Sequence, residues 1–402
     1  MRMRTLGSSD ILVSELALGT QRWGSADFNA PDEATCHKML DLATENGINF
    51  VDTAEQYPIP DGPGKPEGST EKIIGSWLAK APERREKLVI ASKITGGGNV
   101  TPKNIEKDLE GTLKRLGTDY LDLYLLHWPA RYTPQANWGQ SLEYNFVNGK
   151  YARPASSFED IAGAMGKLVK AGKIRGWGMC NDNTYGLMGS IMAARQLGVE
   201  PPCVMQNDYS LINRRIEESG LSEASAPWNE NVGFLAYNTL AGGMLTGKYL
   251  DVPPSADDSN PARALANSIK KRGRMDEPGW GRTLYRYRSG PAAEATQAYA
   301  ALAKEAGLSL TELSLRWCRS RNAVSSVLLG QSSVKQLEEA IEIFNANPAV
   351  EFKDDDEIKY FLPQSLLWEI DRVHMRNRLP IFASTRTQSN WDGRGEIGET
   401  IP

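Results

Sequence analysis

Short apolar runs alternate with amphipathic segments along nearly the whole chain. The apolar runs lie at residues 16–18, 48–51, 88–91, 121–126, 174–178, 204–205, 232–236 and 326–329. Each run is brief and mostly apolar on both faces, which is typical of a parallel strand buried on two sides. The helical segments between them include residues 32–46, 69–80, 102–115, 158–170, 183–197 and 334–344. Eight strands alternating with helices predict a (β/α)8 TIM barrel, an α/β fold.

A doubly wound parallel sheet is the main alternative for this alternation. That fold usually carries a GxGxxG turn after its first strand, whereas here the first apolar run leads into Gly19-Thr20-Gln21, which favours the barrel. Residues 128–155 and 238–290 are too long for ordinary barrel loops, and long loops in compact domains are commonly functional. The tail after residue 345 carries an acidic run at 351–357, and a short helix is expected near residues 365–372.

Composition narrows the classes of protein to which the chain can belong. Apolar residues make up 40% of its 402 residues, an ordinary globular balance, and a net charge of −4 argues against general nucleic-acid binding. Its four cysteines are dispersed, which predicts reduced thiols in a cytoplasmic protein. The three histidines lie far apart, so no metal site is expected. No apolar run reaches the ~18 residues of a membrane span, so we expect no membrane insertion. The sequence does not indicate an oligomeric state.

Polar or ionisable residues follow six successive apolar runs. In chain order they are Asp52, Lys93, His127, Asn181, Gln206 and the pair Tyr237-Asn238. In a barrel of parallel strands the active site lies at the C-terminal ends of the strands. The predicted fold therefore directs all of these side chains into one cavity.

A tyrosine near a lysine, a carboxylate and a histidine suggests proton transfer to a carbonyl. Tyr57 lies five residues after Asp52. A free tyrosine has a pKa of about 10, so the Lys93 ammonium is expected to stabilise the phenolate and lower that pKa, while Asp52 keeps the lysine charged. A neutral His127 would orient the carbonyl oxygen. Each residue alone would more often be structural, as half of an ion pair or as a buried histidine. Their joint position at the strand ends favours catalysis.

These segments resemble the aldo-keto reductase family. The motifs that carry the resemblance are Asp52-Thr53-Ala54-x-x-Tyr57, Ser92-Lys93 and Leu126-His127-Trp128-Pro129. The resemblance covers residues 3–345 and implies one barrel domain over residues 1–345, closed at its floor by a hairpin at 5–13. Residues 346–402 would then form a C-terminal extension packed on or near the barrel. Residues 206–211 and 240–249 are most similar to the NADP(H)-dependent branch, which includes bacterial oxidoreductases and potassium-channel β-subunits.

The resemblance implies an NADPH-dependent enzyme that reduces small aldehydes and ketones to alcohols by hydride transfer. Tyr57 would be the general acid, supported by Lys93 and Asp52, and His127 would orient the carbonyl. Trp23 and Trp128 would line the substrate pocket together with Tyr57 and His127.

The resemblance also assigns residues to the cofactor. Gly19, Thr20, Gln21 and Asp52 would lie under it, Asn181 and Gln206 would hydrogen-bond the carboxamide, and Tyr209 would stack on the nicotinamide ring. Tyr237, Asn238, Leu240, Gly242, Leu245, Gly247 and Lys248 would wrap the pyrophosphate. Gly330, Ser332, Gln336 and Glu339 would hold the adenosine end, where a helix N-terminus suits phosphate.

Three positions depart from the family pattern. Cys180 stands where a serine is usual, Asn238-Thr239 replaces a common Ser-Pro pair, and Ala340 replaces an asparagine. None of them touches the four residues with catalytic roles, so we interpret these departures as changes in cofactor affinity.

A basic stretch lies within the second long insertion. Residues 263–288 hold eight basic residues, opposed by Asp276 and Glu277. Arginine pairs bidentately with phosphate, so Arg282, Arg286 and Arg288 are candidates for the 2′-phosphate that NADPH carries and NADH lacks. The alternative interpretation is a flexible, solvated basic loop.

Two other functions have partial support in the sequence. Gly242-x-x-x-x-Gly247-Lys248 nearly matches a phosphate-binding P-loop, but Tyr249 follows where a Ser or Thr would bind Mg²⁺, so an NTPase is not expected. An NADPH-binding regulatory protein with little turnover, like a channel β-subunit, remains the alternative to an enzyme.

Overall fold

A computed structural model gives the arrangement of the chain. It describes residues 1–25, 29–59, 67–133, 154–250, 272–276, 289–346 and 361–382, together with residues 144, 146, 149, 284 and 287.

Eight parallel strands within these residues close into a barrel, which confirms the predicted fold over the doubly wound sheet. The strands are β3 (Leu16–Gly19), β4 (Phe50–Asp52), β5 (Val89–Ile94), β6 (Leu121–Leu126), β7 (Ile174–Cys180), β8 (Val204–Asp208), β9 (Gly233–Tyr237) and β10 (Ser326–Leu329). Each strand pairs with the next along the chain, and β10 pairs with β3 to close the ring. Every apolar run predicted as a strand falls on one of these strands.

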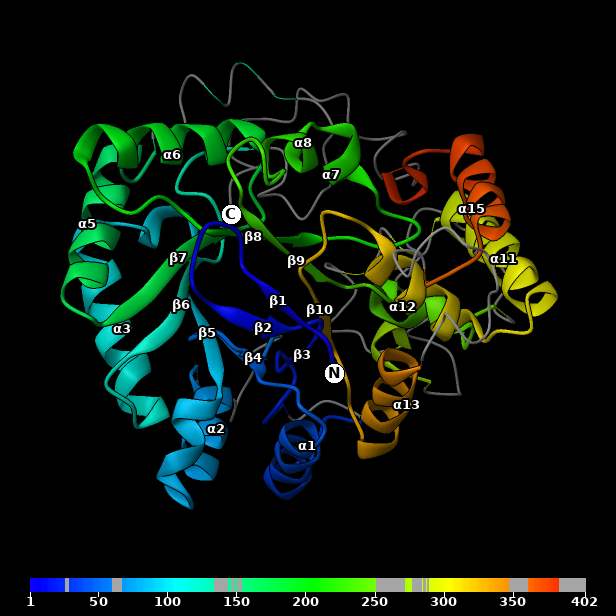
Figure 1. The fold of residues 1–402 in the computed structure, drawn as a ribbon, viewed down its shortest axis with the longest axis horizontal. Coiled ribbons are helices and arrows are strands. Elements are labelled where there is room, and N and C mark those ends of the chain that lie inside the picture. Colours follow the sequence, from blue (N-terminus) through cyan, green and yellow to red (C-terminus); the bar gives the residue numbers. More distant parts are fainter. Residues whose placement is uncertain are drawn as a thin grey trace.

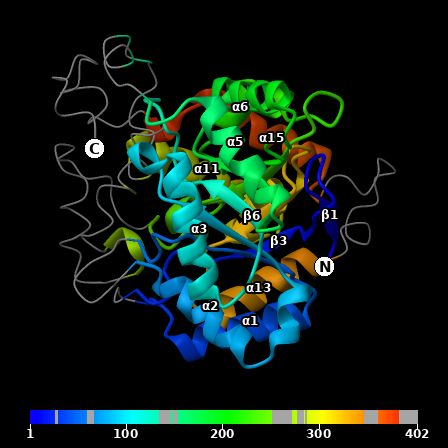
Figure 2. The same cartoon turned by 90° about the vertical axis from the view of Figure 1, so that its left-hand side faces the viewer.

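Helices surround the barrel (Figures 1 and 2). They are α1 (Glu33–Glu45), α2 (Ser69–Ala79), α3 (Pro102–Leu116), α5 (Phe158–Lys170), α6 (Thr184–Leu197), α11 (Gly290–Glu305), α12 (Leu310–Ser320) and α13 (Val334–Asn345). Shorter helices are η1 (Pro82–Lys87), η2 (Gly97–Asn99), α7 (Arg215–Glu218), α8 (Leu221–Ala224), η4 (Ala241–Thr246) and η5 (Arg274–Asp276). The expected helical segments include neither α11 nor α12. The alanine-rich α11 shows a weak apolar periodicity because its residues are small.

An N-terminal hairpin closes one end of the barrel, as expected. Strands β1 (Met3–Thr5) and β2 (Leu12–Ser14) pair antiparallel, and Figure 1 shows them in front of the barrel strands. Leu6, Ile11 and Val13 are buried in one apolar cluster with inward-facing residues of the strands. Gly7 makes this approach possible: its φ is 54°, and a Cβ there would lie 2.5 Å from the carbonyl oxygen of Asn231.

The described part of the C-terminal tail packs beside α11 (Figure 1). It contains α15 (Gln364–Arg376), longer than the helix expected near residues 365–372, and η8 (Pro380–Phe382). Leu367, Ile370 and Val373 are buried in the core between barrel and helices. Asp371 accepts a hydrogen bond from Arg214 Nη1 at 2.6 Å, which ties α15 to the segment after β8.

Candidate active site

A cavity of about 540 Å³ opens at the C-terminal ends of the barrel strands. Its wall is built largely from the residues that end these strands or directly follow them, because parallel strands deliver their C-terminal residues to one rim. Asp52, Tyr57 and His127 are all part of this wall.

Lys93 and Asp52 form a buried ion pair beside the cavity. Lys93 Nζ donates hydrogen bonds of 2.7 Å to Asp52 Oδ1 and of 2.7 Å to the carbonyl oxygen of Thr53, and the lysine side chain is 0% exposed. Asp52 Oδ2 accepts a further bond of 2.8 Å from Gln206 Nε2. Burial by itself would lower the pKa of Lys93, but the charge and hydrogen bond of Asp52, together with the smaller effects of Tyr57 and Cys180, outweigh burial and raise the pKa. Lys93 is therefore positively charged at neutral pH.

Tyr57 lies over this ion pair with its hydroxyl 3.5 Å from Lys93 Nζ. Burial raises the pKa of the Tyr57 phenol, and the opposing effect of Lys93 is smaller. Lys93 therefore lowers the pKa of Tyr57, as expected from the sequence, but removal of the side chain from water has the larger effect, so the net pKa is raised and not lowered. The phenol remains protonated at neutral pH and has a proton to donate.

His127 faces Tyr57 across the cavity wall. The two rings meet edge to face, with centroids 5.6 Å apart and an interplanar angle of 74°. Burial, and secondarily the charge of Lys93, hold the pKa of His127 well below its usual value, so the ring is neutral. Trp128 lines the same cavity, and its ring stacks on His127 with centroids 6.2 Å apart.

Asn181 and Gln206 place two carboxamide side chains on the wall. Asn181 has a left-handed backbone with φ 59°, and its Nδ2 donates to the carbonyl oxygen of His127 at 2.9 Å. Its Oδ1 accepts a hydrogen bond of 2.5 Å from the Tyr237 hydroxyl. Cys180 also lines the cavity and donates its thiol to Gln206 Oε1 at 3.4 Å.

Most residues assigned to the cofactor line this one cavity. Besides Asp52, Asn181 and Gln206, they are Gly19, Thr20, Gln21, Tyr237, Asn238, Leu240, Gly242, Lys248, Gly330, Ser332, Gln336 and Glu339. Arg282, Arg286 and Arg288 lie outside the described residues. Tyr287 between them is described: it is buried, and its hydroxyl donates to Asp208 Oδ2.

Other assigned residues lie away from the cavity wall. Tyr209 is buried between Trp317, at 5.2 Å between ring centroids, and Phe234, at 5.8 Å, and its hydroxyl donates to Glu217. Trp23 is likewise fully buried in the core. Leu245 and Gly247 of the segment after β9 are not among the lining residues either. Of the two tyrosines near the ends of β8 and β9, Tyr237, the last residue of β9, is the one that lines the cavity.

Three basic residues of the wall were not among the assigned residues. Arg22 directly follows Gly19-Thr20-Gln21, and Arg272 and Arg274 belong to the basic stretch of the second insertion. Their positions in the sequence could have identified them. Arg22 lies near the end of the first predicted strand, and Arg272 and Arg274 lie in the insertion after the seventh apolar run.

The wall fits a nicotinamide dinucleotide. The cavity wall that contains Tyr57 also contains the carboxamide side chains of Asn181 and Gln206 and the ring of Tyr237, which suit the amide and the aromatic ring of a nicotinamide. The same wall contains Arg22, Lys248 and Arg274, whose positive charges suit the phosphates of a dinucleotide. Gly242 and Gly243 have φ values of 63° and 101°, which let the backbone of η4 follow the cavity without a side chain.

Across the part of the chain that the structure describes, no cluster of three or more His, Cys, Asp or Glu side chains is arranged to hold a metal ion. Nor does any helix there have the length and apolar character needed to cross a membrane.

Comparison with known proteins places this chain in a family. Residues 15–359 match the aldo/keto reductase family. The chain is 35% identical to protein Tas of Escherichia coli over 93% of this chain and 98% of Tas. It is 32% identical to an aldo-keto reductase of Babesia bovis, over 73% of this chain and 98% of that protein. It is 30% identical to the uncharacterized oxidoreductase YrpG of Bacillus subtilis, over 89% of this chain and 94% of YrpG. The chain therefore belongs to the aldo/keto reductase family, whose members are oxidoreductases that act on carbonyl compounds.

Proposed function

We propose that the protein reduces aldehydes and ketones to alcohols and takes the hydride from NADPH. The observation that carries this proposal is the assembly of Tyr57 and His127 on the cavity wall, with the Lys93–Asp52 ion pair buried beside the tyrosine hydroxyl. Family membership supports the carbonyl chemistry, and the basic side chains of the wall support a phosphorylated cofactor.

Tyr57 is the proton donor in this proposal. When bound, the reduced nicotinamide supplies a hydride to the carbonyl carbon. The Tyr57 O–H bond breaks as its proton passes to the carbonyl oxygen, which leaves a phenolate on the enzyme. Lys93 stabilises this phenolate from 3.5 Å, and Asp52 keeps Lys93 charged and in place.

His127 orients the substrate. Because its ring is neutral, one ring nitrogen carries a proton that can be donated to the carbonyl oxygen, beside the Tyr57 hydroxyl. Trp128 extends the apolar surface next to His127, which favours carbonyl compounds with apolar or aromatic substituents.

Asn181, Gln206 and Tyr237 would hold the nicotinamide. The Tyr237 hydroxyl now donates to Asn181 Oδ1, and a cofactor carboxamide would replace this bond with one of its own N–H groups. Tyr237, rather than Tyr209, is the tyrosine whose position on the wall allows it to stack on the ring.

We also propose that residues 1–345 form the catalytic domain and residues 346–402 an extension that stabilises it. The contacts of α15 with α11 and with Arg214 support this role.

The test is turnover by the purified protein. We expect the absorbance of NADPH to fall in the presence of several aldehydes or ketones, and this loss to disappear in the variant Tyr57→Phe. Tight NADPH binding without turnover of any carbonyl in a broad panel would contradict an enzymatic role and indicate a regulatory protein.

A further inference from the structure

Basic side chains gather on one part of the cavity wall. They come from three separate segments: Arg22 follows β3, Lys248 follows η4, and Arg272 precedes η5, whose first residue is Arg274. Among the described lining residues the carboxylates are Asp52 and Glu339, and Asp52 is already paired with Lys93. Arg272 is paired with the buried carboxylate of Asp276, so Arg22, Lys248 and Arg274 give this part of the wall its excess of positive charge.

These charges are close enough to influence one another. Burial lowers the pKa of Lys248, and the positive charges of Arg274 and Arg22 lower it further. Like charges gathered in a partly desolvated cavity repel, so an anionic ligand relieves this repulsion when it binds.

Arg22 reaches the loop between β10 and α13. Its Nη1 donates to Ser332 Oγ at 3.0 Å, and the side chain is 8% exposed. Ser332 N–H donates to Gln336 Oε1 at 2.8 Å, so this loop and the first turn of α13 form one connected unit. The guanidinium of Arg22 thus lies against the residues to which the adenosine end of the cofactor is assigned.

Arg274 lies against a different set of residues. Its Nη1 donates to Gln21 Oε1 at 3.1 Å and its Nη2 to Asn238 Oδ1 at 3.5 Å. Gln21 and Asn238 lie at the start of the loops after β3 and β9. Gln21 is assigned a place under the cofactor, and Asn238 is assigned to the pyrophosphate. The two arginines therefore approach the ligand at different places.

We propose that Arg22 is the residue that distinguishes NADPH from NADH, by pairing its guanidinium with the 2′-phosphate at the adenosine end. Arg274 contacts the pyrophosphate that both cofactors share. This inference rests on the proposed function. Arginine donates two parallel hydrogen bonds to phosphate oxygens, whereas NADH presents only ribose hydroxyls at the same place.

The experiment compares Arg22→Gln with Arg274→Gln by calorimetric titration, which measures binding without turnover. The ligands are NADPH, NADH and the fragments adenosine 2′,5′-bisphosphate and 5′-AMP. For Arg22→Gln we expect affinity for NADPH and the bisphosphate to fall by about 10- to 100-fold, because a charge-assisted hydrogen bond is lost. Affinity for NADH and 5′-AMP should change by less than about twofold. Arg274→Gln should weaken NADPH and NADH to a similar extent.

Arg22→Lys is a second variant, which keeps the test valid if Arg22→Gln does not fold. Lysine keeps the charge but lacks the planar fork, so we expect an intermediate preference for NADPH, with an unchanged thermal melting temperature. Equal weakening of NADPH and NADH in both Arg22 variants, or no weakening in either, would overturn the assignment of Arg22 while leaving the proposed reductase activity intact. A wild-type protein that binds neither dinucleotide would overturn the proposed function and this inference with it.

Discussion

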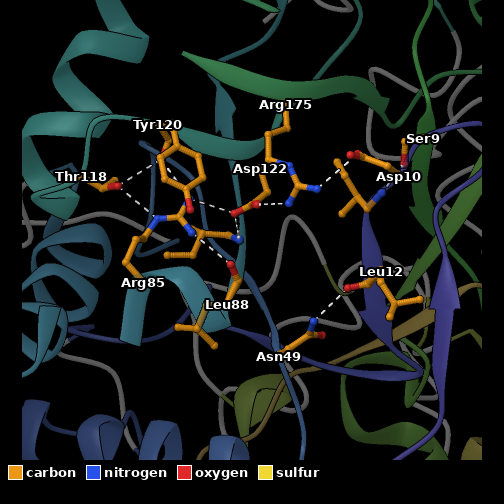
Figure 3. A network of polar contacts seen from close by, with 12 residues as sticks. Ser9, Asp10, Leu12, Asn49, Arg85, Leu88, Thr118, Tyr120, Asp122 and Arg175 are labelled. Atoms are coloured by element: carbon orange, nitrogen blue, oxygen red, sulfur yellow. Dashed lines mark hydrogen bonds and ion pairs between the residues drawn. The ribbon is translucent and has the colours of Figure 1, made fainter. Parts of the chain in front are cut away.

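The barrel holds a buried charge pair at each end, and the two pairs differ in what surrounds them. At the floor, Asp122 and Arg85 meet near the N-terminal ends of β5 and β6 (Figure 3). At the opposite end, Asp52 and Lys93 meet beside the cavity. Both pairs are almost completely shielded from water, so burial of charge alone does not identify a catalytic site.

The floor pair uses nearly all of its hydrogen-bonding capacity on the protein. Asp122 accepts from Arg85, from the backbone N–H of Ile90 and from Arg175. Arg85 also donates to Thr118 Oγ1 and to two backbone carbonyls, and its guanidinium lies 3.9 Å from the centroid of the Tyr120 ring. The bonds to the protein use four of the five guanidinium N–H groups of Arg85, so the pair has a structural role.

The cavity pair leaves one contact loose. Lys93 donates two short bonds to Asp52 and Thr53, but its contact with the Tyr57 hydroxyl is 3.5 Å long. Tyr57 also forms part of the cavity wall, so this contact can strengthen when charge develops on the tyrosine oxygen. Unused capacity that faces a cavity is what separates the proposed catalytic pair from the structural one.

The largest effect on activity is expected from Tyr57→Phe, which removes the hydroxyl that lies 3.5 Å from Lys93 Nζ. Carbonyl reduction should fall by about 10²–10⁴-fold, because only the transferable proton is removed. NADPH affinity, measured by fluorescence titration, should stay nearly constant. Activity close to that of the wild type would show that another group donates the proton.

Lys93→Met should lower kcat by about 10²–10³-fold, because a charge that stabilises the developing phenolate is lost. Burial raises the pKa of Tyr57 and Lys93 opposes this, so without the lysine the phenol stays protonated to still higher pH. Any residual activity should therefore decline at a more alkaline pH than in the wild type, as a pH–rate profile can measure. An unmoved alkaline limb would contradict contact between Lys93 and the reacting phenol. Lys87→Met, on the exposed end of η1, serves as the control.

For Arg85→Met, at the floor of the barrel, we expect a loss of stability without a loss of kcat. Removing one partner leaves Asp122 buried with a reduced set of donors, which should destabilise the protein by about 3–5 kcal/mol in a denaturant titration. The value of kcat, measured well below the melting temperature, should be unchanged. A large loss of kcat in the folded variant would contradict the purely structural role of the Arg85–Asp122 pair.

The smallest effect is expected from Arg175→Met. Arg175 also contacts Asp122, but its side chain is 40% exposed, so solvent screens the interaction. We expect a loss of about 1 kcal/mol or less and no change in kcat. A loss as large as that for Arg85→Met would show that exposure does not rank these contacts.

The sequence by itself determined the barrel and the main part of the site. Short apolar runs set the strands through local periodicity, and closure of the barrel then forced Asp52, Lys93 and His127 to one end. These features depend on the order of residues along each segment, which the chain carries locally.

Tertiary structure decided which neighbouring side chains face the cavity. Tyr209 and Tyr237 each lie close to a strand end, yet packing against Trp317 and Phe234 buries the first and leaves the second on the wall. Arg22 and Ser332 meet although they are more than three hundred residues apart in sequence, because β3 and β10 are neighbours in the closed barrel. The pKa of Tyr57 was also decided at this level. The sequence shows the lysine that favours ionisation of the phenol, but the burial that outweighs its effect comes from segments distant along the chain.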